Sequence, residues 1–206
     1  MNISCACTTF IRENCYLLVD EKSGEAALVD PGKYGVDVKS MLEKNNVSRL
    51  KYILLTHGHF DHILGAVHAK DDVGGEIAIH EADADCLYDA EKAHAVNAFA
   101  KKFVATKADV ILKDGDSLFL GETEIKVMHT PGHTLGSVCF IADGKIISGD
   151  TFFKGTVGRT DLYGGDMKTL MESVMKISAL EGDYEVYPGH NEATTLENER
   201  RYNPYF

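Results

Sequence analysis

Several features are scarce in this sequence of 206 residues, and each scarcity excludes a class of protein. No run of about 18 apolar residues occurs, so we expect no segment that spans a membrane. The first residues contain neither the basic stretch nor the apolar stretch of a signal peptide. Lys and Arg number 21 against 32 Asp and Glu, and the net charge of −11 disfavours a nucleic-acid partner, which basic residues would have to bind. We therefore expect a soluble cytoplasmic protein that binds neither membranes nor nucleic acid.

Cysteine is present in a number and spacing that argue against a disulfide framework. There are five cysteines, an odd count, and no two of them form a C-x-x-C pair. Small secreted domains that depend on disulfides usually have an even count in a shorter chain. We expect reduced thiols, in agreement with a cytoplasmic location.

Proline is also scarce, with four residues, and no proline- or serine-rich linker divides the chain. The length, together with 44% hydrophobic and 26% charged residues, predicts one globular domain over residues 1–206.

Short apolar runs alternate with helical periodicity along the chain. Strands are predicted at Asn14–Val19, Ala26–Val29, Tyr52–Leu55, Glu76–Ile79, Ser117–Leu120, Glu124–His129, Val138–Ile141, Lys145–Ile147 and Tyr184–Tyr187. Helices are predicted at Val36–Lys44, His62–Lys70, Ala82–Lys102, Met167–Leu180 and near Leu196–Arg201. The strands and helices lack the regular alternation of a doubly wound sheet, and Ser117–Met128 has the pattern of a hairpin. The expected class is α/β, with mixed sheets packed together and covered by helices.

Potential metal ligands follow five of the apolar runs, each beside a glycine or proline. Asp30 follows the second run, and the segment from His57 to His62 follows the third. His133, Asp150 and His190 follow later runs in the same way. Because loops at strand ends on one sheet edge can converge, we expect these side chains to meet at one point.

The number of these side chains indicates more than one ion. A lone histidine at a strand end is usually an ordinary polar residue, but this chain concentrates four ligand-type residues within six positions. The seven candidates are His57, His59, Asp61, His62, His133, Asp150 and His190. One tetrahedral zinc accepts only four ligands, whereas two ions that share a carboxylate fit the count.

Several motifs in this chain resemble those of a known family. The segment Thr56-His-Gly-His-Phe-Asp-His62 resembles the T-H-x-H-x-D-H signature of the metallo-β-lactamase-fold superfamily. The segments that resemble its glyoxalase II-like branch, the hydroxyacylglutathione hydrolase-like proteins, are Thr130–Ser137, Gly149–Phe153, Gly158–Leu162 and Pro188–His190. The resemblance implies an αββα sandwich of two mixed sheets flanked by helices, with metals at one edge.

The resemblance also implies a role for each candidate ligand. It places His57, His59 and His133 on a first metal. It places Asp61, His62 and His190 on a second metal. Asp150 would bridge the two ions, with Asp61 and Asp150 as the catalytic carboxylates, and Asp30 would support the ligands from behind. The implied cofactor is a pair of divalent ions, zinc first, with iron or manganese as alternatives. His68, His80, His94 and His129 match no ligand position, and His129 is the one expected to orient a ligand.

The chain departs from glyoxalase II at its C-terminal end. Only sixteen residues follow His190, so we expect no counterpart of the helical domain that, in glyoxalase II, supplies much of the glutathione pocket. The candidates for substrate binding are Arg159, Lys154 and Tyr163. A guanidinium pairs with a carboxylate through two hydrogen bonds, but a surface ion pair of Arg159 with Asp161 or Asp166 is an equal alternative.

The implied activity is hydrolysis of a small-molecule thioester by a hydroxide that bridges two metal ions. A thiolate leaves readily, because the pKa of a cysteine-like thiol is about 8.5, so no strong general acid is needed. The alternative on the same fold is a persulfide dioxygenase with one Fe(II), held by His57, His133 and Asp150. The thiol and acyl parts of the substrate, including glutathione, are left open.

Overall fold

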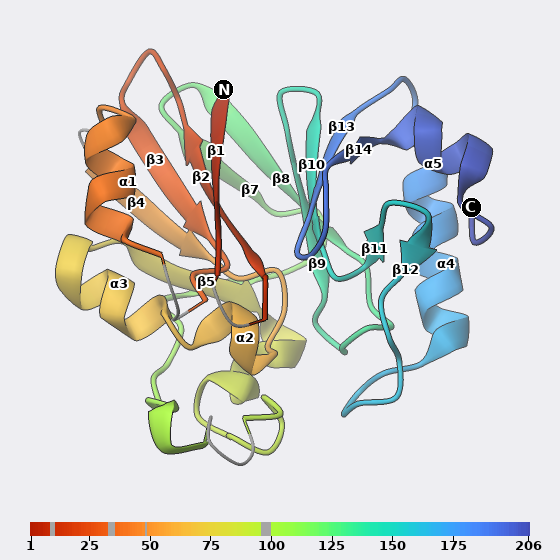
Figure 1. Ribbon diagram of the computed structural model, residues 1–206, viewed down its shortest axis with the longest axis horizontal. Coiled ribbons are helices and arrows are strands. Elements are labelled where there is room, and N and C mark those ends of the chain that lie inside the picture. The colour runs from red at the N-terminus through yellow and green to blue at the C-terminus, as the bar shows by residue number, and fades with distance from the viewer. Residues whose placement is uncertain (9–10, 33–35, 48, 96–99) are drawn as a thin grey trace.

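Two six-stranded sheets face each other in the computed structural model, which describes residues 1–8, 11–32, 36–47, 49–95 and 100–206 (Figure 1). The strands of the first sheet, in spatial order, are β1 (Asn2–Cys7), β2 (Asn14–Val19), β3 (Glu25–Val29), β4 (Arg49–Leu54), β5 (Glu76–His80) and β6 (Val110–Leu112). The pairs from β1 to β3 are antiparallel and those from β3 to β6 are parallel. The first sheet is therefore mixed, as the sequence predicted.

The second sheet is also mixed. Its strands, in spatial order, are β14 (Thr194–Thr195), β13 (Glu185–Pro188), β10 (Lys145–Gly149), β9 (Val138–Ala142), β8 (Thr123–His129) and β7 (Ser117–Leu120). The β10–β13 pair is parallel, and its neighbours are antiparallel. A separate small hairpin consists of β11 (Phe152–Phe153) and β12 (Thr156–Val157).

Burial on both faces of the sheets explains the continuous apolar runs. In β2, Leu18 packs between the sheets with Val127 and Phe140, whereas Leu17 faces the helices on the other side. A strand with both faces covered has no polar alternation. The inner cluster between the two sheets stabilises the sandwich by removing apolar surface from water.

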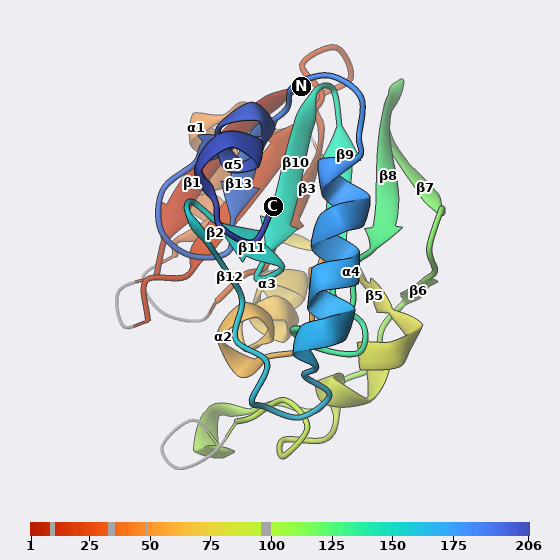
Figure 2. The same ribbon diagram turned by 90° about the vertical axis from the view of Figure 1, so that its right-hand side faces the viewer.

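Helices cover the outer face of each sheet. The helices α1 (Val38–Lys44) and α3 (Ala66–Val73) lie against the first sheet, and α4 (Met167–Ser178) and α5 (Leu196–Tyr202) against the second (Figures 1 and 2). The Asp166 side chain accepts a hydrogen bond from the Thr169 N–H at 2.8 Å and so caps the N-terminus of α4. The predicted αββα sandwich is confirmed. Within the described ranges, no helix has the length and apolar character needed to cross a bilayer.

The prediction of one helix over Ala82–Lys102 is wrong. The segment holds the short 3₁₀ helices η1 (Glu81–Leu87) and η2 (Ala100–Lys102), turns occupy 88–94, and residues 96–99 lie outside the described part. The η1 segment bonds to loops of both sheets through Asp83, and these tertiary contacts override its helical propensity.

The predicted helix over His62–Lys70 is in fact two helices, α2 (Phe60–Ile63) and α3. Gly65 separates them, and a Cβ there would lie 2.0 Å from the Pro31 carbonyl oxygen. This close approach needs glycine, which is a poor residue for a continuous helix. The sequence prediction also omitted β1, β6, β11, β12 and β14.

Candidate metal centre

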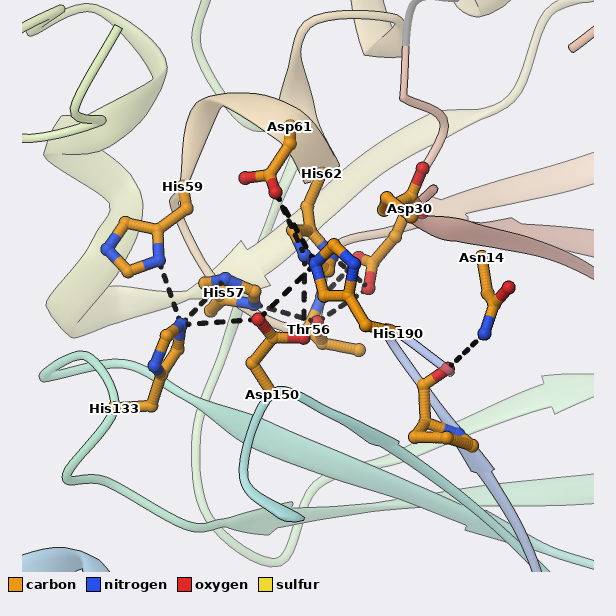
Figure 3. Close-up of polar contacts among 12 residues, drawn as sticks. Asn14, Asp30, Thr56, His57, His59, Asp61, His62, His133, Asp150 and His190 are labelled. Atoms are coloured by element: carbon orange, nitrogen blue, oxygen red, sulfur yellow. Dashed lines mark hydrogen bonds and ion pairs between the residues drawn. The ribbon is translucent and has the colours of Figure 1, made fainter. Parts of the chain in front are cut away.

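All seven predicted ligands lie close together, in loops and in one short helix that follow strands of the two sheets (Figure 3). His57 and His59 come from the loop after β4, and Asp61 and His62 from the adjoining α2. His133, Asp150 and His190 follow β8, β10 and β13. The first sheet thus supplies four of the side chains and the second sheet supplies three.

His57, His59 and His133 form the first group of ligands. Nε2 of His133 lies 3.2 Å from Nε2 of His57 and 2.8 Å from Nδ1 of His59. Nδ1 of His133 donates to the Arg159 main-chain oxygen at 2.8 Å. In the neutral ring, Nε2 therefore carries a lone pair directed at the other two nitrogens. Three imidazole nitrogens converging in this way match a cation site.

Asp61, His62 and His190 form the second group. Nε2 of His190 lies 3.4 Å from Oδ2 of Asp61, and Nε2 of His62 lies 4.0 Å from the same oxygen. Nδ1 of His62 donates to Oδ2 of Asp30 at 2.9 Å, so the neutral ring presents the Nε2 lone pair to the carboxylates. A lone pair facing carboxylate oxygens is repulsive unless a proton or a cation lies between them.

Asp150 lies between the two groups. Its Oδ2 is 3.7 Å from His133 Nε2 and 3.6 Å from His190 Nε2, while its Oδ1 is 3.5 Å from His62 Nε2. One carboxylate is thus in reach of nitrogens from both groups. This is the arrangement in which a carboxylate can bridge two ions.

The unsatisfied atoms of this cluster test whether cations fit. Within the described part of the chain, His62 Nε2 and Asp150 Oδ1, which lie 3.5 Å apart, are buried and lack a hydrogen-bond partner. Buried polar atoms are normally satisfied, so a cluster of exceptions indicates an unaccounted ion. Imidazole and carboxylate donors together suit zinc, iron or manganese. The residues present therefore fit a pair of divalent ions, and the donor set does not distinguish the metals.

The electrostatics of the first group keep His57 and His59 neutral, and the neutral imidazole is the form that binds metals. Burial and the neighbouring His62 and His133 rings hold the pKa of His57 well below its usual value. Burial and His133 lower the pKa of His59 to about 3. Both rings are therefore uncharged at neutral pH and have a lone pair to offer.

The second group has the opposite bias. Burial opposes the charged form of His62, but Asp150, Asp30 and Asp61 outweigh it and raise the pKa of His62 well above its usual value. Burial likewise opposes ionisation of Asp61, but His62 and His190 hold the pKa of Asp61 below its usual value. The carboxylates thus favour a positive charge at this position. A divalent cation, with two charges, stabilises them more than one imidazolium does.

Thr56 connects the two groups from behind, and the sequence reasoning gave it no role. Its N–H and hydroxyl donate to the two oxygens of Asp30 at 2.8 and 2.6 Å, and its Oγ1 lies 3.1 Å from His57 Nδ1. Asp30 thus supports His62 directly and His57 through Thr56. Thr56 is the first residue of the T-H-x-H-x-D-H motif, but the motif does not predict its contact with Asp30, which lies 26 positions away in the sequence.

Two buried carboxyl groups near the centre were also missed. Asp83 is 2% exposed and bonds to loops of both sheets. Glu13 is fully buried, and neither of its carboxyl oxygens has a hydrogen-bond partner among the residues that the structure describes. Burial raises the pKa of Glu13 well above its usual value. No motif in the sequence singled out either residue.

The candidates for substrate binding are engaged with other surface groups. Arg159 pairs with Asp161 through two hydrogen bonds of 2.6 and 2.7 Å, which is the surface ion pair given as the alternative. Lys154 pairs with Glu192 at 2.7 Å. Tyr163 is 51% exposed, with the Lys92 ammonium 5.7 Å from its ring.

His129 does not take the orienting role expected of it. Its ring stacks on His80 with centroids 4.0 Å apart, and its Nε2 lies 2.9 Å from the Leu135 carbonyl oxygen. The groups that orient the ligand rings are Asp30, Thr56 and the Arg159 carbonyl.

Known proteins with similar sequences agree with the geometry of a metal centre. The profile of the metallo-beta-lactamase superfamily matches residues 8–190. A protein of Mycobacterium leprae, ML0493, is 40% identical over 202 residues, covering 93% of this chain and 92% of its own. Hydroxyacylglutathione hydrolase GloC of Haemophilus influenzae is 33% identical over 214 residues, covering 100% of this chain and 98% of its own.

Solved structures share the fold over nearly the whole chain. BLEG-1, a B3 metallo-beta-lactamase, has a TM-score of 0.91 and 31% identity, with 99% of both chains covered. TTHA1623 in a di-iron-bound form has a TM-score of 0.83 and 31% identity, with 98% of this chain and 100% of that chain covered. ETHE1 from Myxococcus xanthus has a TM-score of 0.82 and 25% identity, with 99% of this chain and 84% of that chain covered.

Proposed function

This chain belongs to the metallo-beta-lactamase superfamily, and from that premise we propose that it is a metal-dependent hydrolase of small-molecule thioesters. The active form holds two divalent ions, most simply zinc, in a single domain that acts in the cytoplasm. The partner is the thioester alone, without nucleic acid or membrane. Similarity to the hydroxyacylglutathione hydrolase GloC supports the thioester as the substrate class.

One observation carries the two-ion part of the proposal. The Asp150 carboxylate has Oδ2 within 3.7 Å of His133 and within 3.6 Å of His190, which belong to different groups. A single ion would leave one of these groups with converging lone pairs and no cation between them. Similarity to TTHA1623, which was solved in a di-iron-bound form, supports two ions rather than one.

The residues of this chain orient two of the ligand rings and hold a proton on the outer nitrogen of each. The chemistry supplied by a bound pair of divalent cations is a water of lowered pKa and a positive charge for the carbonyl oxygen of the substrate. Asp30 holds the proton on His62 Nδ1, and the Arg159 carbonyl holds the proton on His133 Nδ1, so that both Nε2 lone pairs face inward. Because a thiolate leaves without protonation, the site needs no separate general acid.

A panel of thioesters assayed beside metal counting on the same preparation tests the proposal. We expect turnover of at least one thioester that depends on metal and is lost on chelation. An ester, an amide and a β-lactam should be included, since BLEG-1 is a β-lactamase with the same fold. A metal-saturated preparation that hydrolyses none of the thioesters contradicts the proposal.

Persulfide oxidation is the second candidate, and similarity to ETHE1 favours it. The three side chains that would hold one iron also lie together, with His133 Nε2 3.2 Å from His57 Nε2 and 3.7 Å from Asp150 Oδ2. Protein purified anaerobically with iron should then consume oxygen when a persulfide is added. Absence of oxygen uptake by the iron-loaded protein contradicts this alternative.

A further inference from the structure

Asp83 contacts both loops that carry the first group of ligands, although it lies more than 20 residues from each of those ligands. Its Oδ2 accepts hydrogen bonds from the Gly58 N–H at 2.8 Å and from Thr134 Oγ1 at 2.7 Å. Its Oδ1 accepts one from the Gly136 N–H at 2.7 Å. The residue is 2% exposed, so these bonds form away from solvent.

The three donors are placed beside the ligands themselves. Gly58 lies between His57 and His59, in the loop that follows β4 of the first sheet. Thr134 directly follows His133, in the loop that follows β8 of the second sheet. One carboxylate therefore connects the loop that carries His57 and His59 with the loop that carries His133.

The packing around Asp83 leaves little room for the two loops to move. A Cβ at Gly136 would lie 2.6 Å from Asp83 N and 2.7 Å from its Cγ. A Cβ at Gly58 would lie 2.4 Å from Cβ of Cys86, which also belongs to η1. The main chain of both loops thus packs directly against η1, and the glycines make that contact possible.

The hydrogen-bonding chemistry requires a carboxylate rather than an amide. Three donors meet two oxygens, and each oxygen accepts at least one of them. An asparagine has a single acceptor oxygen, so its amide nitrogen would face the N–H of either Gly58 or Gly136. A buried donor facing another donor is unfavourable, so the two loops would separate.

We propose that Asp83 is the positioning residue of the first metal, holding the His57–His59 loop and the His133 loop at the separation that brings their three nitrogens together. The inference rests on the two-ion centre of the proposed function but is independent of its substrate. Asp83 does not touch the reacting atoms, so its role is to position the ligands.

The test compares Asp83→Asn with Glu81→Gln, both without metal at the start. Glu81 is the matched control, because it lies in the same 3₁₀ helix but has an exposed side chain, 3.7 Å from Lys113. Each protein is titrated with Co²⁺ against a competing chelator, with the cobalt absorption spectrum recorded and the unfolding temperature of the metal-free protein measured.

For Asp83→Asn, we expect one of the two cobalt ions to bind about 10–100-fold more weakly, as is typical when a group supporting metal ligands is lost. The change should affect the absorption of the site formed by three imidazoles and leave the other ion unchanged. Glu81→Gln should bind both ions as the wild type does.

The opposite result is equally clear. If Asp83→Asn binds both ions with wild-type affinity and spectrum, the proposal is overturned, even where the unfolding temperature falls, because Asp83 would then stabilise only the fold.

If Asp83→Asn does not fold, the Thr134→Val variant is tested in its place, since it removes one hydrogen-bond donor and keeps the shape of the side chain. A smaller loss of the same ion supports the proposal, and unchanged affinity overturns it. If the wild type binds one cobalt ion only, the two-ion centre is contradicted. The role of Asp83 is then tested by whether Asp83→Asn lowers the affinity for that single ion.

Discussion

The Asp30 carboxylate lies 2.9 Å from Nδ1 of His62 and fixes which nitrogen of that ring carries the proton. Neither residue is more than 1% exposed, so water cannot replace the contact. The same carboxylate accepts two hydrogen bonds from Thr56, whose Oγ1 lies 3.1 Å from His57 Nδ1. One buried aspartate therefore sets the orientation of rings in both groups of ligands.

Replacing Asp30 should weaken metal binding without removing a ligand. In Asp30→Asn, the amide nitrogen would face the His62 N–H or the Thr56 donors, which favours the wrong tautomer of His62. We expect the affinity for an ion at the second group, and the activity that depends on it, to fall about 10–100-fold. Chelator competition measures the affinity. Asp71→Asn, on the exposed surface of α3, is the control, and equal effects of both substitutions would contradict the role of Asp30.

Asp150→Ala should have a larger effect than Asp30→Asn, because it removes a side chain in reach of both groups. We expect activity to fall by more than the ~100-fold upper limit for supporting residues, and at least one ion to be lost. Steady-state kinetics and metal counting on the same sample are the measurements. Near-normal turnover by Asp150→Ala would mean that this carboxylate does not bridge two ions.

Removing metal should lower stability as well as activity. Asp61 and Asp150 both lie close to His190 Nε2, at 3.4 and 3.6 Å, and without a cation only protonated imidazole offsets their charge. A bound ion stabilises the folded state according to its concentration relative to its dissociation constant. We expect the unfolding temperature to fall on chelation and to return when two equivalents of metal are added. Full recovery with a single equivalent would contradict a two-ion centre.

His80 is a histidine outside the metal ligands whose protonation should affect stability. Burial, and then the adjacent His129, lower the pKa of His80 below its usual value, while Asp83, Glu81 and Asp114 oppose this. Between that lowered value and about 6.5, the unfolded chain binds a proton that the folded protein excludes. The free energy of unfolding therefore decreases as the pH falls through this interval, by at most about 1.4 kcal/mol per pH unit.

His80→Asn should reduce that dependence on pH. Asparagine keeps an acceptor for the Ala82 N–H, which His80 Nδ1 now caps at 3.3 Å, but it does not titrate. Urea unfolding of the metal-free proteins between pH 5 and 7 measures the effect. The control is His68→Asn, because His68 is exposed on α3. Curves for His80→Asn and the wild type that stay parallel would show that His80 does not titrate in this range.

The predicted strands show what apolar patterning can and cannot determine. Runs such as Asn14–Val19 are buried on both faces, so the hydrophobic pattern is continuous and the prediction of the strand was correct. The edge strands β1 and β6 were not predicted, because β1 is half-exposed and β6 has only three residues. The η1 segment had the pattern of a helix, but Asp83 holds it in place through contacts with residues 25 to 53 positions away.

The same distinction between local sequence pattern and distant contact applies to the metal site. His57, His133 and Asp150 were predicted because each directly follows an apolar run beside a glycine or proline, and the structure brings them together. Of the supporting groups, Asp30 was expected from the resemblance, and its contacts with His62 and Thr56 agree with that role. The others were not predicted, since their roles depend on distant contacts. A threonine or a main-chain carbonyl, such as that of Arg159, has no signature in a sequence.

The pairing of Arg159 with Asp161 leads to the last prediction, on substrate binding. The two side chains are 60% and 67% exposed and form two hydrogen bonds, so the guanidinium is accessible but its charge is already neutralised. If Arg159 binds a substrate carboxylate, Asp161 competes for the same group. Asp161→Asn should then lower the KM for a thioester with a carboxylate, whereas Arg159→Ala should raise it and change kcat little, because the contact is made equally in the ground and transition states. Arg159→Lys should recover only part of the loss, since an ammonium cannot form the two-pronged pair. A neutral thioester is the control substrate, and its KM should be the same for all four proteins. Equal changes for charged and neutral substrates would show that the Arg159–Asp161 pair holds the loop and takes no part in recognising the substrate.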